Sequence, residues 1–356
     1  MTETPGDGPA RGGPALKAPA PVMTDVARLA GVSLQTVSRV VNDTPHVSGP
    51  TRAKVLAAMD QLGYRRNAVA RALATRRSGI IGVITFDTLL HGPVRLLYAV
   101  DRAACRSGLG VAIAVVDRFD AGSATRAVRR LQDLAVEGVI AVVPNRSSVD
   151  VLTTALGPTP AVLLGGAGLD ESTTLPAVGI DHRGGAVAAT RHLLDLGHRT
   201  VHHVAGPQDW PSADRRVEGW RATLDAAGAR IPPLVTGDWT AASGHAGMRE
   251  LLSLDPDVTA VFVANDHMAL GALSALAEAG RRVPEDVSVV GFDDEPTAVY
   301  YRPPLTTVRQ PLTDAAERAL HRLLDVIRPE AAGTPLPALV AAELVVRHST
   351  APPPSR

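Results

Sequence analysis

Residues 33–42, which read SLQTVSRVVN, predict a short helix with an unusual outward face. Val37, Val40 and Val41 recur three and four residues apart, so one side of this helix is predicted to be an inward apolar stripe. The other side combines an apolar group, two hydrogen-bonding groups and a cation, with no acid among them: Leu34, Gln35, Ser38 and Arg39. A helix that presents an unbalanced cation indicates a partner that supplies the negative charge.

The segments on either side complete a helix-turn-helix pattern. The preceding stretch, TDVARLAG, is apolar at Val26, Leu29 and Ala30 before Gly31 ends it, and Ser33 is a good N-cap for the second helix. A third helix is predicted in PTRAKVLAAMDQLGY, which opens on proline. Two short helices joined by a glycine turn are typical of proteins that lay the second helix in the major groove of DNA.

Charge is distributed unevenly, although the formal net charge of the 356 residues is zero. Residues 22–78 hold nine Lys and Arg against three acids, a net +6; residues 1–21 are balanced, so residues 79–356 carry −6. A basic module on an acidic body predicts a polyanion as partner of the module alone. In a major groove Leu34 can touch a thymine methyl, Gln35 can bridge adenine and Arg39 can fork onto guanine. The alternative is a solvated helix that happens to lack acids.

The rest of the composition excludes several classes of protein. Residues 1–21 are rich in Pro and Gly, lack the apolar core of a secretory signal and are predicted to be a disordered leader. No apolar run is long enough to cross a bilayer. Cys105 is the single cysteine, which rules out a disulfide framework within one chain. We therefore expect a cytoplasmic protein with no membrane partner.

After Gly79 the pattern changes to one of sheets and covering helices. Short apolar runs such as GIIGVITF, GVIAVV and AVFVAND alternate with amphipathic segments such as AVAATRHLLDLG. Strands that are apolar throughout predict parallel sheets covered on both faces, and their number predicts two lobes. Ligands bind such sheets beyond the carboxyl ends of the strands, so the residues that follow each run are candidates for a binding site.

Between these parts, residues 65–79 read RRNAVARALATRRSG. Asn67 can cap a two-turn helix there, but so short a helix is marginal in water by itself. The functional interpretation is a segment that folds only against DNA, with an apolar residue wedged into the minor groove. The alternative is a plain basic linker.

The longest motifs resemble those of a known family. TDVARLAGVSLQTVSRVVNDTPHVSGPTRAKVLAAMDQLGYRRNAVARALA is followed in order by LGHRTVHHVAGP, RRVEGW, GDWTAASG, VFVANDHMALGAL, VSVVGFDD and PPLTTVRQ. From Val22 to about Thr350 the chain thus resembles the lac repressor and galactose repressor family, and its β-galactoside-responsive members in particular.

The resemblance implies an all-α helix-turn-helix headpiece with a hinge helix, followed by an α/β two-lobed core like that of periplasmic sugar-binding proteins. The implied parts are a leader (1–21), the DNA-binding domain (22–66), the hinge helix (67–78), the effector-binding and dimerisation core (79–350) and a tail (351–356). Within the core, the N-lobe would comprise about 79–179 and 312–340, and the C-lobe about 180–308 and 341–350.

It also implies roles for individual residues. Leu34, Gln35 and Arg39 match the residues that read base edges. The matches to phosphate-contacting or supporting positions are Thr24, Thr36, Ser38, His46 and Asn67, and those to minor-groove contacts of the hinge are Ala70 and Leu73. The matches to effector-binding positions are Ser212, Arg216, Trp239, Asn265, Asp293 and Gln310. Phe86 and residues 144–146 depart from the lactose-responsive pattern.

Other motifs have simpler interpretations. Trp239 could be structural, and Asp294 a solvated loop charge. His202 and His203 are neighbours on a strand and so point to opposite faces, which argues against a metal site; they, like Asp181 and His182, are predicted to be capping or surface residues. No nucleophile stands with a base in a recognisable motif, so no enzymatic activity, cofactor or metal is expected.

The sequence therefore predicts a ligand-responsive DNA-binding regulator, most simply a repressor released from a palindromic operator by a sugar. Two chains would pair through their cores, and closure of the lobes around the ligand would pull the two hinge helices apart. The main alternative is a corepressor-dependent regulator of the same fold that senses a purine or another small metabolite. A transport-type sugar-binding protein would share the core but would have no use for residues 22–78.

Overall fold

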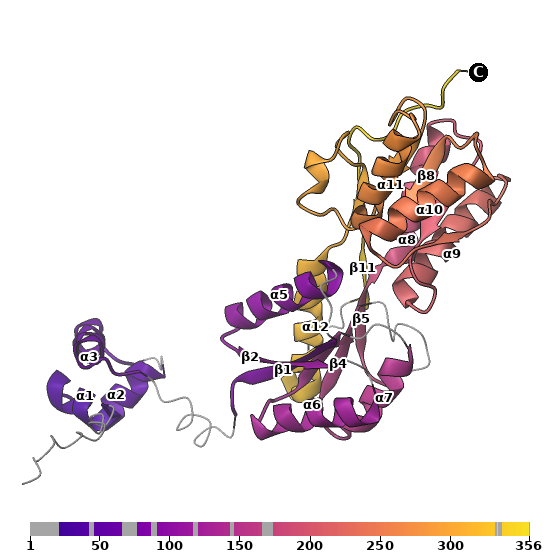
Figure 1. Cartoon of the computed structure of the whole chain (residues 1–356). Helices are drawn as coiled ribbons and strands as arrows, with labels where there is room; N and C mark the ends of the chain where they lie inside the picture. The colour runs from indigo at the N-terminus through magenta and orange to yellow at the C-terminus, as the bar shows by residue number, and fades with distance from the viewer. Residues whose placement is uncertain are drawn as a thin grey trace, which may run out of the picture. The chain divides into compact units, whose positions relative to one another are not determined.

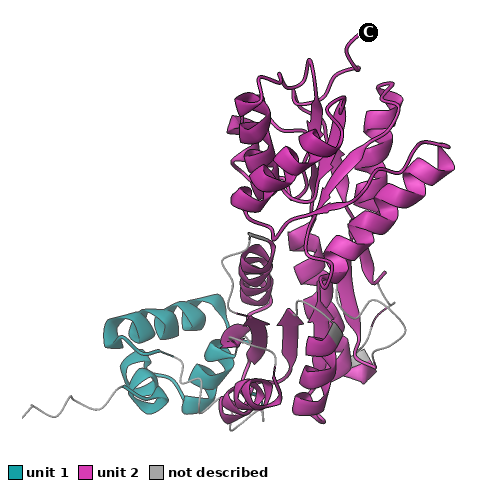
Figure 2. Ribbon diagram, turned by 45° about the vertical axis from the view of Figure 1, so that its right-hand side comes forward, with its two compact units in different colours: residues 1–77 teal, residues 78–356 magenta. Residues whose placement is uncertain are grey.

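The computed structural model describes residues 21–42, 46–65, 77–86, 91–116, 120–142, 146–165, 174–331, 333 and 337–355. The chain forms two compact units, residues 1–77 and residues 78–356 (Figure 2). None of the described helices is long and apolar enough to cross a membrane.

The first unit is a three-helix domain, with α1 at Met23–Ala30, α2 at Leu34–Val41 and α3 at Gly49–Leu62 (Figure 1). The glycine turn and the cap form as predicted: Gly31 has φ 65°, and the Ser33 hydroxyl accepts the Thr36 N–H at 3.2 Å. The apolar stripe is also confirmed, since Val37 and Val40 are buried. These local features explain why two short helices meet at a fixed angle here.

The buried face of α1 is formed by Val26 and Ala27, with Met23 and Ala30 packed beside them. Leu29 is 45% exposed and lies outside this core.

The second unit begins with a six-stranded sheet in the order β11-β5-β4-β3-β1-β2, in which all neighbours are parallel. Its strands are β1 Ile80–Phe86, β2 Gly110–Val116, β3 Val139–Val142, β4 Ala161–Leu164, β5 Ala177–Asp181 and β11 Leu339–Ala341. Helices α5 (His91–Arg106) and α12 (Leu312–Ile327) cover one face, and α6 (Ala121–Asp133) and α7 (Arg146–Leu156) cover the other. This is the parallel sheet covered on both faces that the apolar runs predicted.

A second parallel sheet follows, in the order β7-β6-β8-β9. Its strands are β6 His202–Ala205, β7 Val235–Thr236, β8 Ala260–Val263 and β9 Ser288–Val290, and β10 Thr307–Arg309 pairs with β12 Glu343–Val345 beside it. Helices α10 (Ala241–Leu254) and α11 (Asp266–Glu278) pack on one face, and α8 (His182–Asp195) and α9 (Pro211–Ala226) on the other. Figure 1 shows the two sheets as separate lobes of this unit.

The chain passes between the lobes three times, at the junctions β5 to α8, β10 to α12 and β11 to β12. Three separate connections hold the lobes beside each other while leaving room for a hinge motion. They also bring the residues after β1, in the first lobe, near those after β6 and β9, in the second.

Candidate functional site

The outward face of α2 is accessible, as a base-reading surface requires. Leu34, Gln35 and Arg39 are exposed, with Leu34 47% exposed. Thr36 and Ser38 are half-buried beside the N-cap and the C-cap, and the Ser38 hydroxyl accepts a hydrogen bond from the Asn42 amide at 3.2 Å. Of the four side chains predicted to face outward, Leu34, Gln35 and Arg39 are therefore exposed, and Ser38 is half-buried.

The other predicted DNA contacts divide into two sets. Thr24, on α1, and His46, before α3, are exposed, and His46 has φ 83°. Asn67, Ala70 and Leu73 lie outside the described residues.

A second cluster lies at the carboxyl ends of β6, β8 and β9, and Arg216 is at its centre. This residue of α9 is 3% exposed, and its Nη1 donates to the Ala264 carbonyl just after β8. Nη2 lies 3.7 Å from the Asp293 carboxylate and 3.4 Å from Nδ1 of His182. The guanidinium also lies 3.8 Å from the centroid of the Phe292 ring. Burial lowers the pKa of Arg216 to about 10, so it remains cationic at neutral pH.

Asp293 is the anionic partner, held in an uncommon backbone conformation. It is 8% exposed with φ 119°, and its Oδ1 accepts a hydrogen bond from the Gln310 amide. Burial raises the pKa of Asp293, and the charge of Arg216 opposes that rise. The structure thus brings together Arg216, Asp293 and Gln310, which are far apart in the sequence.

Asn265 and Trp239 form the second part of the cluster. Asn265 caps α11, accepting the Met268 N–H at 2.8 Å, and its amide donates to the Trp239 carbonyl at 3.1 Å. Trp239 has φ 75°, and its ring packs against Gly206, where a Cβ would lie 2.3 Å from the ring. The Arg216 guanidinium lies 5.3 Å from the Trp239 ring centroid. Asn265 therefore has a positioning role that the sequence analysis did not foresee.

An aromatic contact that was not predicted from the sequence joins the two lobes. The rings of Trp210 and Trp239 meet edge to face at 5.6 Å, and Phe86 meets Trp210 in the same way at 5.6 Å. Phe86 ends β1 in the first lobe, whereas Trp210 precedes α9 in the second. Ser212, one turn before Arg216, is half-buried. Trp210 could have been found from its position in the sequence, because it lies soon after the end of a predicted strand.

Several histidines are not the surface residues expected. His182, His202 and His203 are all buried. His182 contacts Arg216, and burial together with that positive charge holds the pKa of His182 well below its usual range. His203 stacks on Phe262, and burial lowers its pKa to about 4. Asp181 does cap α8, by accepting the Gly184 N–H at 2.7 Å.

Asp294 is not a solvated loop charge either. Its side chain is 9% exposed and forms ion pairs with Arg309 at 2.7 Å and Arg347 at 2.5 Å. Among the described residues, no three His, Cys, Asp or Glu side chains are placed to hold a metal ion.

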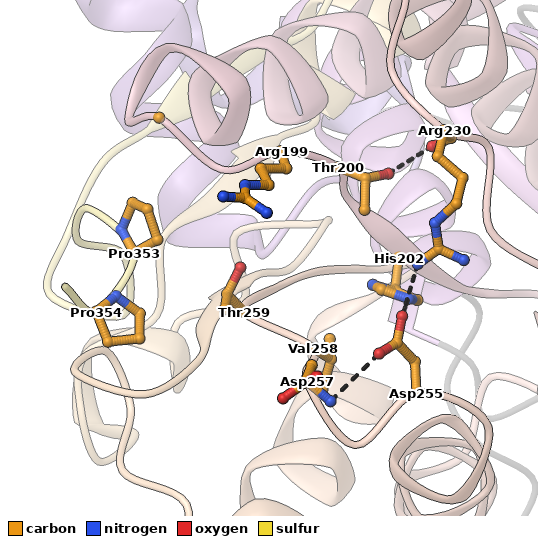
Figure 3. A pocket seen from close by; sticks show the side chains of 11 residues that line it. Arg199, Thr200, His202, Arg230, Asp255, Asp257, Val258, Thr259, Pro353 and Pro354 are labelled. Atoms are coloured by element: carbon orange, nitrogen blue, oxygen red, sulfur yellow. Dashed lines mark hydrogen bonds and ion pairs between the residues drawn. The ribbon is translucent and has the colours of Figure 1, made fainter. Parts of the chain in front are cut away.

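A hollow of about 600 Å³ lies at the opposite, amino ends of β6 and β8 (Figure 3). Arg230 and His202 both contact Asp255 there, at 2.6 and 3.1 Å, and Arg199 and Asp257 complete its charged lining. Two arginines therefore face two aspartates, which leaves no net charge for a ligand to neutralise. Ligands of parallel sheets bind at the carboxyl ends of strands, which favours the Arg216 cluster as the effector site.

Family models match parts of both units of the chain. Residues 22–67 match the family model "Bacterial regulatory proteins, lacI family", and residues 190–350 match "Periplasmic binding protein-like domain". The lactose operon repressor of Escherichia coli (strain K12) is 38% identical over 310 residues, 86% of this chain and 85% of that protein. The regulator CelR of Thermobifida fusca is 38% identical over 344 residues, 92% of this chain and 98% of that protein.

Solved structures show the same relationship. A lac repressor dimer bound to operator and the anti-inducer ONPF has a TM-score of 0.79 at 36% identity, covering 94% of this chain and 100% of that one. A CelR–cellobiose complex has a TM-score of 0.69 at 34% identity, covering 92% of this chain and 99% of that one.

A DNA-binding head joined to a two-lobed effector-binding core defines a ligand-responsive transcriptional regulator. The chain belongs to the lac repressor (LacI) family. It is a DNA-binding transcriptional regulator of that family.

Proposed function

We propose that this repressor binds a palindromic operator as a homodimer and is released by a β-galactoside or a closely related β-linked sugar. The observation that carries this proposal is the set of groups around Arg216 and Trp239. Among the described residues, the Arg216 Nε and Trp239 Nε1 hydrogens are buried without a hydrogen-bond partner. Buried donors of this kind favour a ligand that brings acceptors, and sugar hydroxyls do so.

The roles of the side chains follow from their chemistry. The Asp293 carboxylate accepts hydrogen bonds from hydroxyls, and the Arg216 guanidinium donates to them. Gln310 and Ser212 can do either. Trp239, which is 6% exposed in this structure, is the aromatic residue that we propose to stack on the C–H surface of a pyranose ring. A purine base has no hydroxyl groups to pair with this set of donors and acceptors, which makes the corepressor alternative less well supported.

Release follows from closure of the lobes. Phe86 reaches Trp210 across the lobes, so a sugar that draws the two lobes together also shifts the first lobe, to which the hinge segment connects. Hinge helices that fold only as a pair on DNA would then separate. The coupling is reciprocal, so operator DNA weakens sugar binding by the same factor. As a DNA-binding regulator, the protein acts in the cytoplasm.

The test is fluorescence anisotropy of a labelled palindrome with a central CG step, titrated with the protein. Methyl β-galactoside, cellobiose and hypoxanthine are added in parallel. We expect nanomolar-range binding that a β-linked sugar weakens and that hypoxanthine leaves unchanged.

Each other result has a defined meaning. Tighter binding with hypoxanthine would show a corepressed regulator. Tight binding unchanged by all three compounds would reject the β-linked sugar and keep the regulator. If the protein does not bind this palindrome, selection from random DNA decides whether the chosen operator sequence or the headpiece assignment is wrong.

Trp239→Phe should remove most of the sugar-induced change in intrinsic fluorescence and weaken sugar binding roughly threefold to tenfold, because aromatic contacts contribute about 0.5–1.5 kcal/mol. Trp220 provides the control, since it is fully buried in the C-lobe and its indole donates to the Val201 carbonyl at 2.8 Å. A signal lost in Trp220→Phe but retained in Trp239→Phe would contradict the assignment. The measurement is a fluorescence titration with methyl β-galactoside.

A further inference from the structure

Asp266, the first residue of α11, has a fully buried carboxyl group beside the effector site. Its Oδ2 accepts the Glu295 N–H at 2.8 Å, and its Oδ1 accepts the Thr307 hydroxyl at 2.5 Å. Its own N–H donates to the Phe292 carbonyl at 2.8 Å. Burying a carboxyl group costs free energy unless donors compensate, and these donors do so. Burial and the nearby Asp293 charge raise the pKa of Asp266 well above its usual range.

The hydrogen bonds of Asp266 hold the chain on both sides of Asp293. Phe292 precedes it and Glu295 follows it by two residues, and both are bonded to Asp266. Asp293 and Asp294, with φ 119° and 51°, occupy the left-handed region that favours glycine. A turn of this kind persists only where surrounding contacts hold it.

The Asp266 carboxyl group lies so close to this turn that the turn requires a glycine. A Cβ at Gly291 would lie 2.3 Å from the Asp266 Oδ1. The third segment held by the carboxyl group is β10, which begins at Thr307 and leads to Gln310. Asp293 also donates its N–H to the Val308 carbonyl on that strand, at 2.8 Å. One carboxyl group therefore ties together the three segments that carry Asn265, Asp293 and Gln310.

We infer that Asp266 is the positioning residue of the effector site: it holds Asp293 and Gln310 in place against Arg216 and so sets effector affinity without contacting the effector. This inference rests on the proposed function for the location of the effector. It assigns to Thr307 a matching role, because the Thr307 hydroxyl is the side-chain donor to that carboxyl group.

The chain offers a closely matched control. Thr306 and Thr307 are adjacent and both fully buried, but the Thr306 hydroxyl accepts the Arg347 N–H at 2.9 Å instead of contacting Asp266. Thr307→Val and Thr306→Val therefore remove the same group from neighbouring positions. Thr307→Ser keeps the hydroxyl, and Asp266→Asn leaves one oxygen for two donors.

Two readouts are measured on the full chain. The first is hydrogen exchange by mass spectrometry over residues 291–296 without any ligand. We expect Thr307→Val and Asp266→Asn to speed exchange there at least about tenfold, and Thr306→Val and Thr307→Ser to leave it near the parent rate. The second is sugar affinity by titration with methyl β-galactoside. We expect a loss of about tenfold or more for Thr307→Val and Asp266→Asn, and less than about threefold for the other two.

Operator affinity is also measured without sugar. We expect each variant to keep the parent affinity, and an unchanged affinity shows that the variant is folded. Unchanged exchange in Thr307→Val, or equal acceleration in Thr306→Val, would overturn the inference. Faster exchange with an unchanged sugar affinity would also overturn it. If the parent protein binds no sugar, the proposed function fails, and the exchange measurement alone decides whether Asp266 holds the turn.

Discussion

Arg216→Met is expected to keep the repressor on its operator at sugar concentrations that release the parent protein. The guanidinium contacts the Ala264 carbonyl, His182 and Asp293 in a buried site, so methionine removes the guanidinium donors that the sugar would use there. Truncating one member of a buried charge pair costs about 2–5 kcal/mol, which corresponds to roughly 30-fold to several-thousand-fold in affinity. The measurement is operator anisotropy against sugar concentration, with direct sugar binding in parallel.

Arg215 provides the control for this prediction. It precedes Arg216, is 40% exposed and pairs with Glu218 at 2.9 Å, an exposed contact of small energetic value. Arg215→Met should therefore respond to sugar as the parent does. If Arg216→Met is unstable because Asp293 is left unpaired, Arg216→Met with Asp293→Asn removes both charges. Release of either Arg216 variant at the parent sugar concentration would contradict the assignment.

Arg39→Ala is expected to weaken binding to the specific operator by about 1–3 kcal/mol while barely changing binding to non-specific DNA. The side chain is exposed on α2 beside Gln35, and no acidic side chain lies on that helix. A residue that reads a base contributes only where that base is present, whereas a phosphate contact acts on all sequences. The measurement is competition anisotropy with operator and scrambled duplexes.

Arg28 on α1 provides the comparison. Its side chain is 79% exposed and pairs with Asp25 at 3.2 Å, so Arg28→Ala should change the affinity for both duplexes little. Equal losses on the operator and on scrambled DNA in Arg39→Ala would show a phosphate contact instead of base reading.

The headpiece could be predicted because its determinants are local. Gly31 supplies the left-handed turn, Ser33 caps the next helix, and the valine spacing sets the buried face within ten residues. The parallel sheets could be predicted for a similar reason, since a strand covered on both faces must be apolar at every position.

The residue cluster that we propose as the effector site was predicted in part. The motif resemblance named Arg216, Trp239, Asn265, Asp293 and Gln310, and the structure brings these residues together. The resemblance could not show that the Asn265 amide donates a hydrogen bond to the Trp239 carbonyl. The role of Trp210 was not predicted because it consists of edge-to-face contacts with two rings, Phe86 and Trp239, that lie at the ends of different strands.

The sequence by itself thus determined the class of protein: a basic head with an unbalanced helix, two lobes of parallel sheet, and polar residues at the strand ends. Only the tertiary structure decided which charges pair with each other and which of these pairs are buried. Asp294 is paired with Arg309 and Arg347, whereas Asp293, its neighbour, faces Arg216 in the buried site. The physical reason is that burial and pairing depend on segments that are distant in the sequence, whereas helix caps and strand patterns depend on neighbours along the chain.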